Sequence, residues 1–310
     1  MTKWSRGWAI AVLSLLATLL LAGHKYVPNS PGNVGSLVET FLPWIGLTIP
    51  VLLILAIWRR SVPAIAAAAA ASLVWLAMFG HLILPGKGGG QANLRVLTHN
   101  IEASNPDPAA TAQALVAYNA DIIALQEMTP EALDEAGRIL AGTYPYHVTG
   151  GTVGLWSKHR LASTGSVDIG MGWTRALRAQ AETPSGPVAI YVAHLASVRV
   201  GSEGFTSGQR DRTINDLGKA IGAEKLDRVI VMGDLNGTAY DRSLAPLTFG
   251  LTSVQAQAGW GFGFTWPAKF PMARIDHILV RGMTATSSQV LPATTSDHRP
   301  ISADLDLQAG

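Results

Sequence analysis

The amino-acid sequence contains no cysteine, and charged residues make up only 14% of it, against about 25% in an average protein. Without cysteine, neither a disulfide framework nor a thiol catalyst is possible. Internal repeats are also missing, and low-complexity sequence is confined to an alanine run at residues 66–71 and a glycine-rich stretch at residues 86–90. The 310 residues suffice for one domain of ordinary size plus an appendage.

The shortage of charge is concentrated in the first third of the chain, where three apolar segments cover residues 7–23, 41–58 and 62–84. A helix rises about 1.5 Å per residue, so the first two are near the lower limit for crossing a hydrocarbon core of about 30 Å, and the third is comfortably long. We therefore predict three transmembrane helices. The alanines of the third segment leave a buried soluble helix as its alternative, but its length and its flanking basic residues favour a spanning helix.

The first segment has a second interpretation, as a signal peptide, because Lys3 and Arg6 precede an apolar run of suitable kind. No Ala-x-Ala cleavage site lies near Gly23, and two further apolar segments come after it. Both facts favour a helix that stays in the protein.

Basic residues in the connections predict the orientation. Lys3 and Arg6 precede the first segment, Arg59 and Arg60 lie in the second connection, and the first connection holds a single lysine and a single glutamate. Because cytoplasmic connections are enriched in Lys and Arg, the amino terminus should be cytoplasmic. Three crossings then place the chain after Pro85 outside. The predicted location is the cell membrane, with an extracytoplasmic domain.

The predicted membrane anchor, residues 1–84, leads into a flexible linker at residues 85–93, where Pro85 stops the helix and the glycines uncouple the next domain. The domain at residues 94–310 has a different charge balance. Residues 1–93 hold six of the 23 Lys and Arg and one of the 21 Asp and Glu, which leaves 17 basic and 20 acidic residues, a formal charge of −3. A domain that grips long nucleic acid usually carries a basic face, and the sequence shows no clear basic cluster.

From Leu94 onward, short β-rich runs alternate with helical stretches. Largely apolar, often β-branched runs bounded by turn residues predict strands at residues 94–97, 122–125, 188–193 and 228–232. Helices are predicted at residues 108–118, 130–140 and 211–221. The second of these helices has Thr129 as its N-cap and proline at its first position.

Polar motifs follow or end the predicted strands, and one more lies late in the chain. They are Asn100-Ile101-Glu102, Gln126-Glu127, Ala193-His194-Leu195, Gly233-Asp234-Leu235-Asn236 and Ser296-Asp297-His298-Arg299-Pro300. Taken singly, each has an ordinary structural interpretation, as a turn, a helix start or a structural histidine. Strand ends are nevertheless where layered α/β domains often place their chemistry, and an imidazole beside a carboxylate can be tuned for acid, base or electrostatic work.

The order and combination of the motifs are more specific than any one of them. With Arg274-Ile275-Asp276-His277 ahead of the last motif, the set resembles the endonuclease/exonuclease/phosphatase superfamily over residues 94–307. The resemblance implies an α/β (α+β) four-layer sandwich, in which two mixed β-sheets lie face to face, helices flank them, and the site lies at one end.

The resemblance also implies a site for Mg²⁺ or Mn²⁺. Glu127 would be the main ligand, assisted by Asn100 and Glu102, and Asp297 would lie on the metal side. Oxygen ligands of this kind suit hard divalent cations.

The remaining motif residues would carry the catalytic roles of a phosphohydrolase. By the same resemblance, Asp234 would orient or deprotonate the attacking water, and Asn236 and His194 would hold phosphate oxygens. His298 would stabilise the charge that develops there, and Asp276 would orient His298. Well-placed donors and a cation can supply most of the stabilisation that phosphoryl transfer needs.

The substrate is inferred from location. A phosphohydrolase tethered to a membrane meets lipid head groups at high effective concentration, so membrane lipids are expected partners and a lipid-linked phosphate or diphosphate is the leading substrate. An aromatic and glycine-rich stretch at residues 260–266 could meet lipid or fill the core. The arrangement also resembles membrane-bound VanJ-type proteins of the superfamily, associated with glycopeptide resistance, which implies undecaprenyl diphosphate or a related cell-wall carrier.

Two other functions stay open. An extracytoplasmic nuclease acting on DNA or RNA is the main alternative, less favoured because the domain is mildly acidic. A membrane module that kept the fold only for binding is the other, and the presence of Glu127, Asp234, Asn236 and His298 argues against it.

Overall fold

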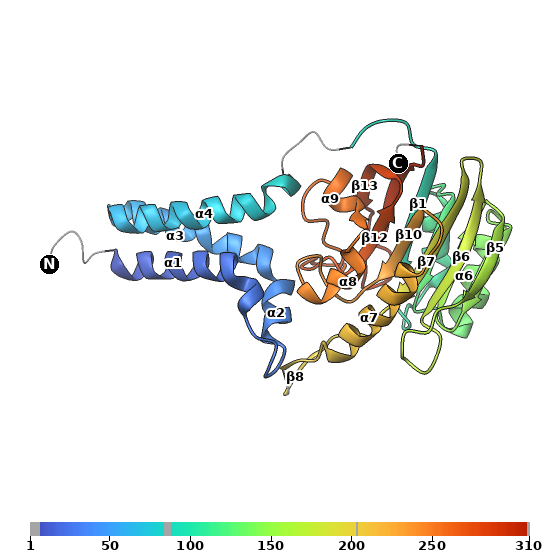
Figure 1. The fold of residues 1–310 in the computed structure, drawn as a ribbon, viewed down its shortest axis with the longest axis horizontal. Coiled ribbons are helices and arrows are strands. Elements are labelled where there is room, and N and C mark those ends of the chain that lie inside the picture. Colours follow the sequence, from blue (N-terminus) through green and yellow to red (C-terminus); the bar gives the residue numbers. More distant parts are fainter. Residues whose placement is uncertain (1–6, 84–87, 203, 309–310) are drawn as a thin grey trace. The chain divides into compact units, whose positions relative to one another are not determined.

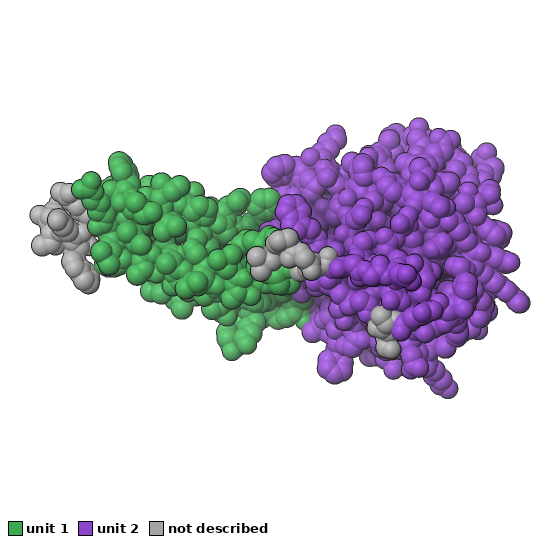
Figure 2. Space-filling model, turned by 90° about the horizontal axis from the view of Figure 1, so that it is seen from above, with its two compact units in different colours: residues 1–84, 200–206, 240–242 green, residues 85–199, 207–239, 243–310 purple. Residues whose placement is uncertain are grey.

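The computed structural model describes residues 7–83, 88–202 and 204–308, and the chain divides into two compact units (Figure 2). One unit consists of residues 1–84 together with 200–206 and 240–242. The other contains the rest of the chain, from residue 85 onward. We call them the helical unit and the sheet unit. Residues 85–87 of the predicted linker lie outside the described residues.

Two long apolar helices form the frame of the helical unit, α1 (Trp8–Gly23) and α4 (Val62–Ile83), which pack side by side (Figure 1). The alanine run has a clear role here, because Ala64, Ala68 and Ala71 share one face of α4 and are fully buried. Large apolar side chains instead point outward, such as Leu19 at 59% and Leu73 at 68% exposure. Helix α4, and α1 together with the 3₁₀ turn η1 (His24–Tyr26) that continues it, are long and apolar enough to cross a membrane.

The middle apolar segment differs from the prediction. Instead of one helix over residues 41–58, the chain forms α2 (Val34–Thr40), the 3₁₀ helix η2 (Leu42–Leu47) and α3 (Thr48–Trp58), with a bend of 62° after α2. The bend lies at Phe41, ahead of η2, and Pro43 occupies the first turn of η2, where a missing N–H group is tolerated. With 11 residues, α3 is about 16 Å long, half of a hydrocarbon core. A third crossing therefore exists only if the bent pair acts as one span.

Glu39 of the helical unit is fully shielded from solvent. Its carboxylate accepts hydrogen bonds from Arg242 Nε at 3.0 and 3.1 Å and from the Arg242 backbone N–H at 3.0 Å. His24 Nδ1 lies 3.0 Å from the same carboxylate. A buried carboxylate needs this kind of compensation, which residues 240–242 bring to the unit. The short hairpin of β8 (Val200–Gly201) and β9 (Gly204–Phe205) also belongs to the helical unit.

Two six-stranded sheets form the centre of the sheet unit. The first has the order β13-β14-β1-β2-β4-β3 and consists of β1 (Leu94–Asn100), β2 (Ile122–Gln126), β3 (Tyr146–Gly150), β4 (Val153–Ser157), β13 (Thr284–Val290) and β14 (Ile301–Asp306). The second has the order β11-β12-β10-β7-β6-β5 and consists of β5 (Leu161–Ser166), β6 (Ala176–Thr183), β7 (Gly186–His194), β10 (Val229–Asp234), β11 (Thr252–Ser253) and β12 (Asp276–Arg281). The pairs β1–β2 and β7–β10 are parallel and the other pairs antiparallel, so both sheets are mixed.

Helices cover the outer faces of the two sheets. Buried residues of α5 (Pro108–Val116) and α6 (Pro130–Ala141) join one apolar cluster with the first sheet, and those of α7 (Gly208–Gly222) join another with the second (Figure 1). A third cluster fills the space between the sheets. The predicted four-layer sandwich is thus confirmed. The chain also forms the short helical segments η3 (Arg242–Leu244), α8 (Ala245–Thr248) and α9 (Val254–Ala258).

The predicted strands and helices of the sheet unit all form, and their register decides where the motifs meet. In the parallel pair β1–β2, Asn100 lies opposite Gln126, and in the parallel pair β7–β10, Asp234 lies opposite His194. Strands β1 and β10 also face each other across the core. The carboxyl ends of all four strands therefore open at the same end of the sandwich.

Candidate functional site

The four strand ends bring an amide, two carboxylates and an imidazole together. Asn100 Nδ2 lies 3.0 Å from Glu127 Oε1 and 3.0 Å from Asp234 Oδ2. His194 Nε2 lies 3.5 Å from Glu127 Oε1 and 3.7 Å from Asp234 Oδ2. Side chains separated by 134 residues in sequence thus share one small polar space.

Unusual backbone conformations aim several of these side chains. Glu102, Glu127 and Asn236 have φ values of 65°, 59° and 48°, in the left-handed region that non-glycine residues rarely adopt. Gly233 has φ 143°, and a Cβ there would lie 2.0 Å from the carbonyl oxygen of Ala193 on the neighbouring strand. Such strain concentrates at functional sites, so these positions agree with a chemical role for the motifs.

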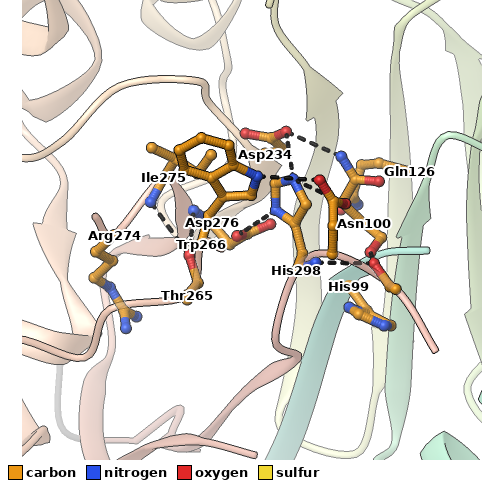
Figure 3. Close-up of polar contacts among 12 residues, drawn as sticks. His99, Asn100, Gln126, Asp234, Thr265, Trp266, Arg274, Ile275, Asp276 and His298 are labelled. Carbon is orange, nitrogen blue, oxygen red and sulfur yellow. Dashed lines mark hydrogen bonds and ion pairs between the residues drawn. The ribbon is translucent and has the colours of Figure 1, made fainter. Parts of the chain in front are cut away.

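A histidine–carboxylate pair forms the other side of the site (Figure 3). His298 Nδ1 donates a hydrogen bond of 2.8 Å to Asp276 Oδ2, and His298 Nε2 lies 3.8 Å from Asp234 Oδ2. Burial alone would lower the pKa of His298, but the charge and hydrogen bond of Asp276 raise it to about 10. Burial alone would raise the pKa of Asp276, whereas the charge of His298 lowers it. The pair is therefore an imidazolium held by a carboxylate at neutral pH.

Asp234 is a strongly perturbed carboxylate of the site. Burial raises its pKa to about 7, against the opposing positive charge of His298. Its Oδ1 accepts the Asn236 backbone N–H at 2.8 Å, and its Oδ2 accepts the Asn236 side-chain amide at 3.2 Å. Burial, with the positive charges of Arg175 and His298, lowers the pKa of His194 well below its ordinary value, so this imidazole is neutral. The Asp234 carboxylate, whose pKa is about 7, thus lies beside one neutral and one charged histidine.

The loop that carries Asn236 is held by buried side chains. Asn236 Nδ2 donates to the carbonyl oxygen of Leu195 at 3.1 Å, and the fully buried Arg210 donates to the carbonyl oxygen of Asn236 at 3.1 Å. His277 Nε2 donates to the carbonyl oxygen of Gly237 at 2.8 Å. The loop is thus fixed on both sides of the asparagine.

Glu102 and Asp297 lie at the rim of the site, joined by a hydrogen bond to the backbone. Glu102 Oε2 accepts the Asp297 backbone N–H at 2.9 Å, and Glu102 Oε1 accepts Ser104 Oγ at 2.7 Å. Asp297 Oδ2 accepts Trp266 Nε1 at 3.1 Å, and its side chain is 49% exposed. These contacts do not bring either carboxylate among Glu127, His194 and Asp234, so their role as metal ligands stays a prediction.

The donor set can be tested for its fit to a cation. Ligand atoms of Glu127, His194 and Asp234 lie within 4.8 Å of one another, as do those of Asp234, Asp276 and His298. The second group does not fit, because His298 is protonated and hydrogen-bonded to Asp276. The first group fits, since Glu127 and Asp234 offer carboxylate oxygens, and a cation would compensate the negative charge of Asp234, whose pKa burial raises to about 7.

Two features of the site carry no signal in the sequence motifs. Gln126, which precedes Glu127 in its motif, lies opposite Asn100 and donates to Thr98 Oγ1 at 3.0 Å, a buried structural contact. Arg175, which no motif contains, lies before β6 with its side chain among the site's charges. A single arginine ahead of a strand forms no recognisable sequence pattern. Only the antiparallel pairing of β6 with β7 brings Arg175 to the site.

Sequence comparison identifies relatives of the sheet unit. Residues 97–298 match the Endonuclease/Exonuclease/phosphatase family. Over 85 residues the chain is 34% identical to the uncharacterized protein YbhP of Escherichia coli strain K12, a stretch that makes up 26% of this chain and 33% of YbhP. The protein of the same name from Shigella flexneri matches to the same extent. The matching stretch thus spans about a third of these relatives.

Solved structures with little sequence identity share the fold. D. rerio TDP2, humanized by 14 mutations, gives a TM-score of 0.59 at 20% identity and covers 69% of this chain and 98% of its own. The mannosyl-6-phosphatase Bt3783 of Bacteroides thetaiotaomicron gives 0.57 at 17% identity, with 69% and 100% covered. Beta toxin of Staphylococcus aureus gives 0.56 at 14% identity, with 68% and 99% covered. Because the family match spans more than half of the chain and includes the converging strand ends, this protein belongs to the endonuclease/exonuclease/phosphatase family.

Proposed function

We propose that this protein is a membrane-anchored phosphohydrolase that depends on Mg²⁺ or Mn²⁺ and acts outside the cytoplasm on a lipid-linked phosphate or diphosphate, such as undecaprenyl diphosphate. One observation carries the chemical part. Glu127 and Asp234 lie on either side of Asn100, with the charged His298 3.8 Å from Asp234. Family membership makes phosphoric ester hydrolysis the reaction class expected of such a group.

Glu127, Asp234, His194 and Asn100 would hold the cation, which when bound neutralises negative charge on phosphoryl oxygens. The predicted ligands Glu102 and Asp297 would support it from the rim.

The chain's own side chains divide the remaining work. The Asp234 carboxylate would orient a water molecule and accept its proton, beside the imidazolium of His298. The imidazolium of His298 offers an N–H to negative charge that develops on the phosphoryl group, and Asp276 fixes the ring through its other nitrogen. Asn236 would position a phosphate oxygen through its side-chain amide, on a loop that is held on both sides.

The lipid part of the proposal rests on the apolar helices. Two described helices are long and apolar enough to span a bilayer, and a tethered enzyme meets lipid head groups at high effective concentration. In the sheet unit, Trp260 is 76% and Phe270 66% exposed, which suits contact with lipid or with an apolar substrate chain. The VanJ-type resemblance narrows the substrate to a cell-wall carrier and the role to antibiotic resistance.

The alternative is an extracytoplasmic nuclease. Its support is the shared fold with D. rerio TDP2, which has been solved in complex with a single-strand DNA product. The formal charge of −3 on residues 94–310 disfavours it, because affinity for nucleic acid depends mainly on phosphate contacts from Lys and Arg.

A substrate panel separates the two functions. The purified full-length protein, in detergent with Mg²⁺, is given undecaprenyl diphosphate, a phosphodiester lipid, single-stranded DNA and RNA. We expect fastest turnover of the lipid diphosphate and loss of all turnover in Asp234→Asn. Faster cleavage of DNA or RNA than of the lipid would establish the nuclease instead.

A further inference from the structure

Arg175 is locked beside the site by its backbone. It directly precedes β6, whose first residue, Ala176, pairs with Ala193 of β7. The Arg175 carbonyl oxygen accepts the His194 backbone N–H at 2.8 Å. The arginine therefore shares the position of His194 at the end of the second sheet.

The side chain of Arg175 is buried but only partly bonded. It is 7% exposed, and its Nη2 donates to the carbonyl oxygen of Leu195 at 3.2 Å. Its Nε has no hydrogen-bond partner among the described residues. The guanidinium lies over the Trp173 ring at 5.1 Å, which shields one face of the planar group. Burying an N–H of a charged group without a partner is costly, so this donor is expected to have a partner in the working protein.

The surrounding charges indicate the nature of that partner. Asp234 and Glu127 are near enough to favour the charged form of Arg175 against its burial, and Arg175 in turn acts on His194. These residues belong to the group that would hold the cation and the phosphate. A planar guanidinium with an unused N–H suits the oxygen of a phosphoryl group better than any other ligand class of this site.

We propose that Arg175 is a further substrate-binding residue that donates its Nε–H to a non-bridging oxygen of the phosphoryl group, while its Nη2 stays on the Leu195 carbonyl. This inference rests on the proposed function, because it assigns a ligand to the same site. A residue needed only to hold the Leu195 carbonyl would require a single N–H group. A phosphate dianion would accept a hydrogen bond from the second N–H group, Nε–H, and would also be attracted by the positive charge of the guanidinium.

The test measures binding rather than turnover, with inorganic phosphate as the probe. Titration calorimetry on the full-length, Mn²⁺-loaded protein in detergent gives the phosphate affinity, and a separate titration gives the Mn²⁺ affinity. Arg175→Gln should weaken phosphate binding about tenfold or more, since hydrogen bonds to charged groups contribute about 1.5–3 kcal/mol. Its Mn²⁺ affinity should be equal or higher, because a positive charge near the carboxylates is gone.

Two further variants keep the test decisive. Arg175→Lys keeps the charge but cannot serve the Leu195 carbonyl and a phosphate oxygen together, so it should also weaken phosphate binding while melting like the wild type. Arg178→Gln is the matched control: it removes a nearby arginine in β6 that pairs with Glu224 at 3.0 Å, and it should change neither affinity.

The outcomes distinguish the two claims. Wild-type phosphate affinity in both Arg175 variants would overturn the inference and leave the proposed function standing. Parallel loss of Mn²⁺ affinity, phosphate affinity and melting temperature in Arg175→Gln, with full recovery in Arg175→Lys, would show a structural arginine and also overturn it. A wild-type protein that binds no phosphate and hydrolyses nothing in the substrate panel would refute the proposed function itself.

Discussion

Asp234 and His298 both bind a proton more tightly in the folded state than in the unfolded state. Burial raises the pKa of Asp234 from 3.8 to about 7, and Asp276 raises the pKa of His298 from 6.5 to about 10 despite its burial. The stabilisation from His298 is therefore complete below about pH 6.5 and is lost as the pH rises through about 10. The stabilisation from the proton on Asp234 is complete below about pH 3.8 and is lost as the pH rises through about 7.

We therefore predict that Asp234→Asn, which mimics the protonated side chain, becomes more stable relative to the metal-free wild type as the pH rises from about 4 to about 7. The free-energy difference should grow by up to about 1.4 kcal/mol per pH unit, the value for one proton. The measurement is thermal unfolding of both proteins with a chelator present, at a series of pH values. Glu131→Gln, on the exposed start of α6, is the control and should follow the wild type. Parallel curves for Asp234→Asn and wild type would contradict the raised pKa of this carboxylate.

At the scale of elements, strands β1, β2, β7 and β10, helices α5, α6 and α7, and the meeting of the motifs were predictable from the sequence. A run such as residues 229–234 is recognisable by apolar β-branched residues that end in Gly-Asp, and parallel pairing then fixes which ends coincide. Arg175 was not predictable, because its place depends on antiparallel pairing across a hairpin rather than on local pattern. The bend at Phe41 and the 3₁₀ geometry of η2 were missed because the apolar composition of residues 41–58 predicts only a continuous helix.

Because the middle segment is bent, the number of membrane crossings has to be measured. Two and three crossings place the sheet unit on opposite sides of the membrane. An odd number of crossings places the sheet unit outside when the amino terminus is inside, and an even number keeps both on one side. Because the chain has no cysteine, single cysteines can be introduced without background. Val62→Cys tests the connection before α4, where the side chain is 76% exposed, and Glu131→Cys tests the sheet unit.

We predict that a membrane-impermeant maleimide applied to intact cells labels Glu131→Cys and spares Val62→Cys. This is the pattern for three crossings with an inner amino terminus. Labelling of Val62→Cys with protection of Glu131→Cys would mean that α2, η2 and α3 do not cross, and the proposed extracytoplasmic activity would then be wrong. Permeabilised cells, in which both variants should react, provide the control.

At the scale of the whole molecule, the division of the chain is less simple than its hydropathy suggests. Apolar segments and a glycine-rich linker predict a clean boundary near residue 84, yet residues 200–206 and 240–242 belong to the helical unit. Arg242 joins that unit through Glu39, 203 residues earlier, and such a distant pair leaves no mark on local sequence. The sequence does contain one indication of this pairing, because Glu39 is the single acidic residue among the first 93.

The central claim, cation-dependent hydrolysis of a phosphate at the converging strand ends, is tested most directly by phosphate release from undecaprenyl diphosphate with wild type and Glu127→Ala. We predict release by the wild type with Mg²⁺, none with a chelator, and a loss of about 100-fold or more in Glu127→Ala, as expected when an electrostatic element of the site is removed. Glu131→Ala should match the wild type. Release by Glu127→Ala at the wild-type rate, or release that continues in the chelator, would contradict the claim.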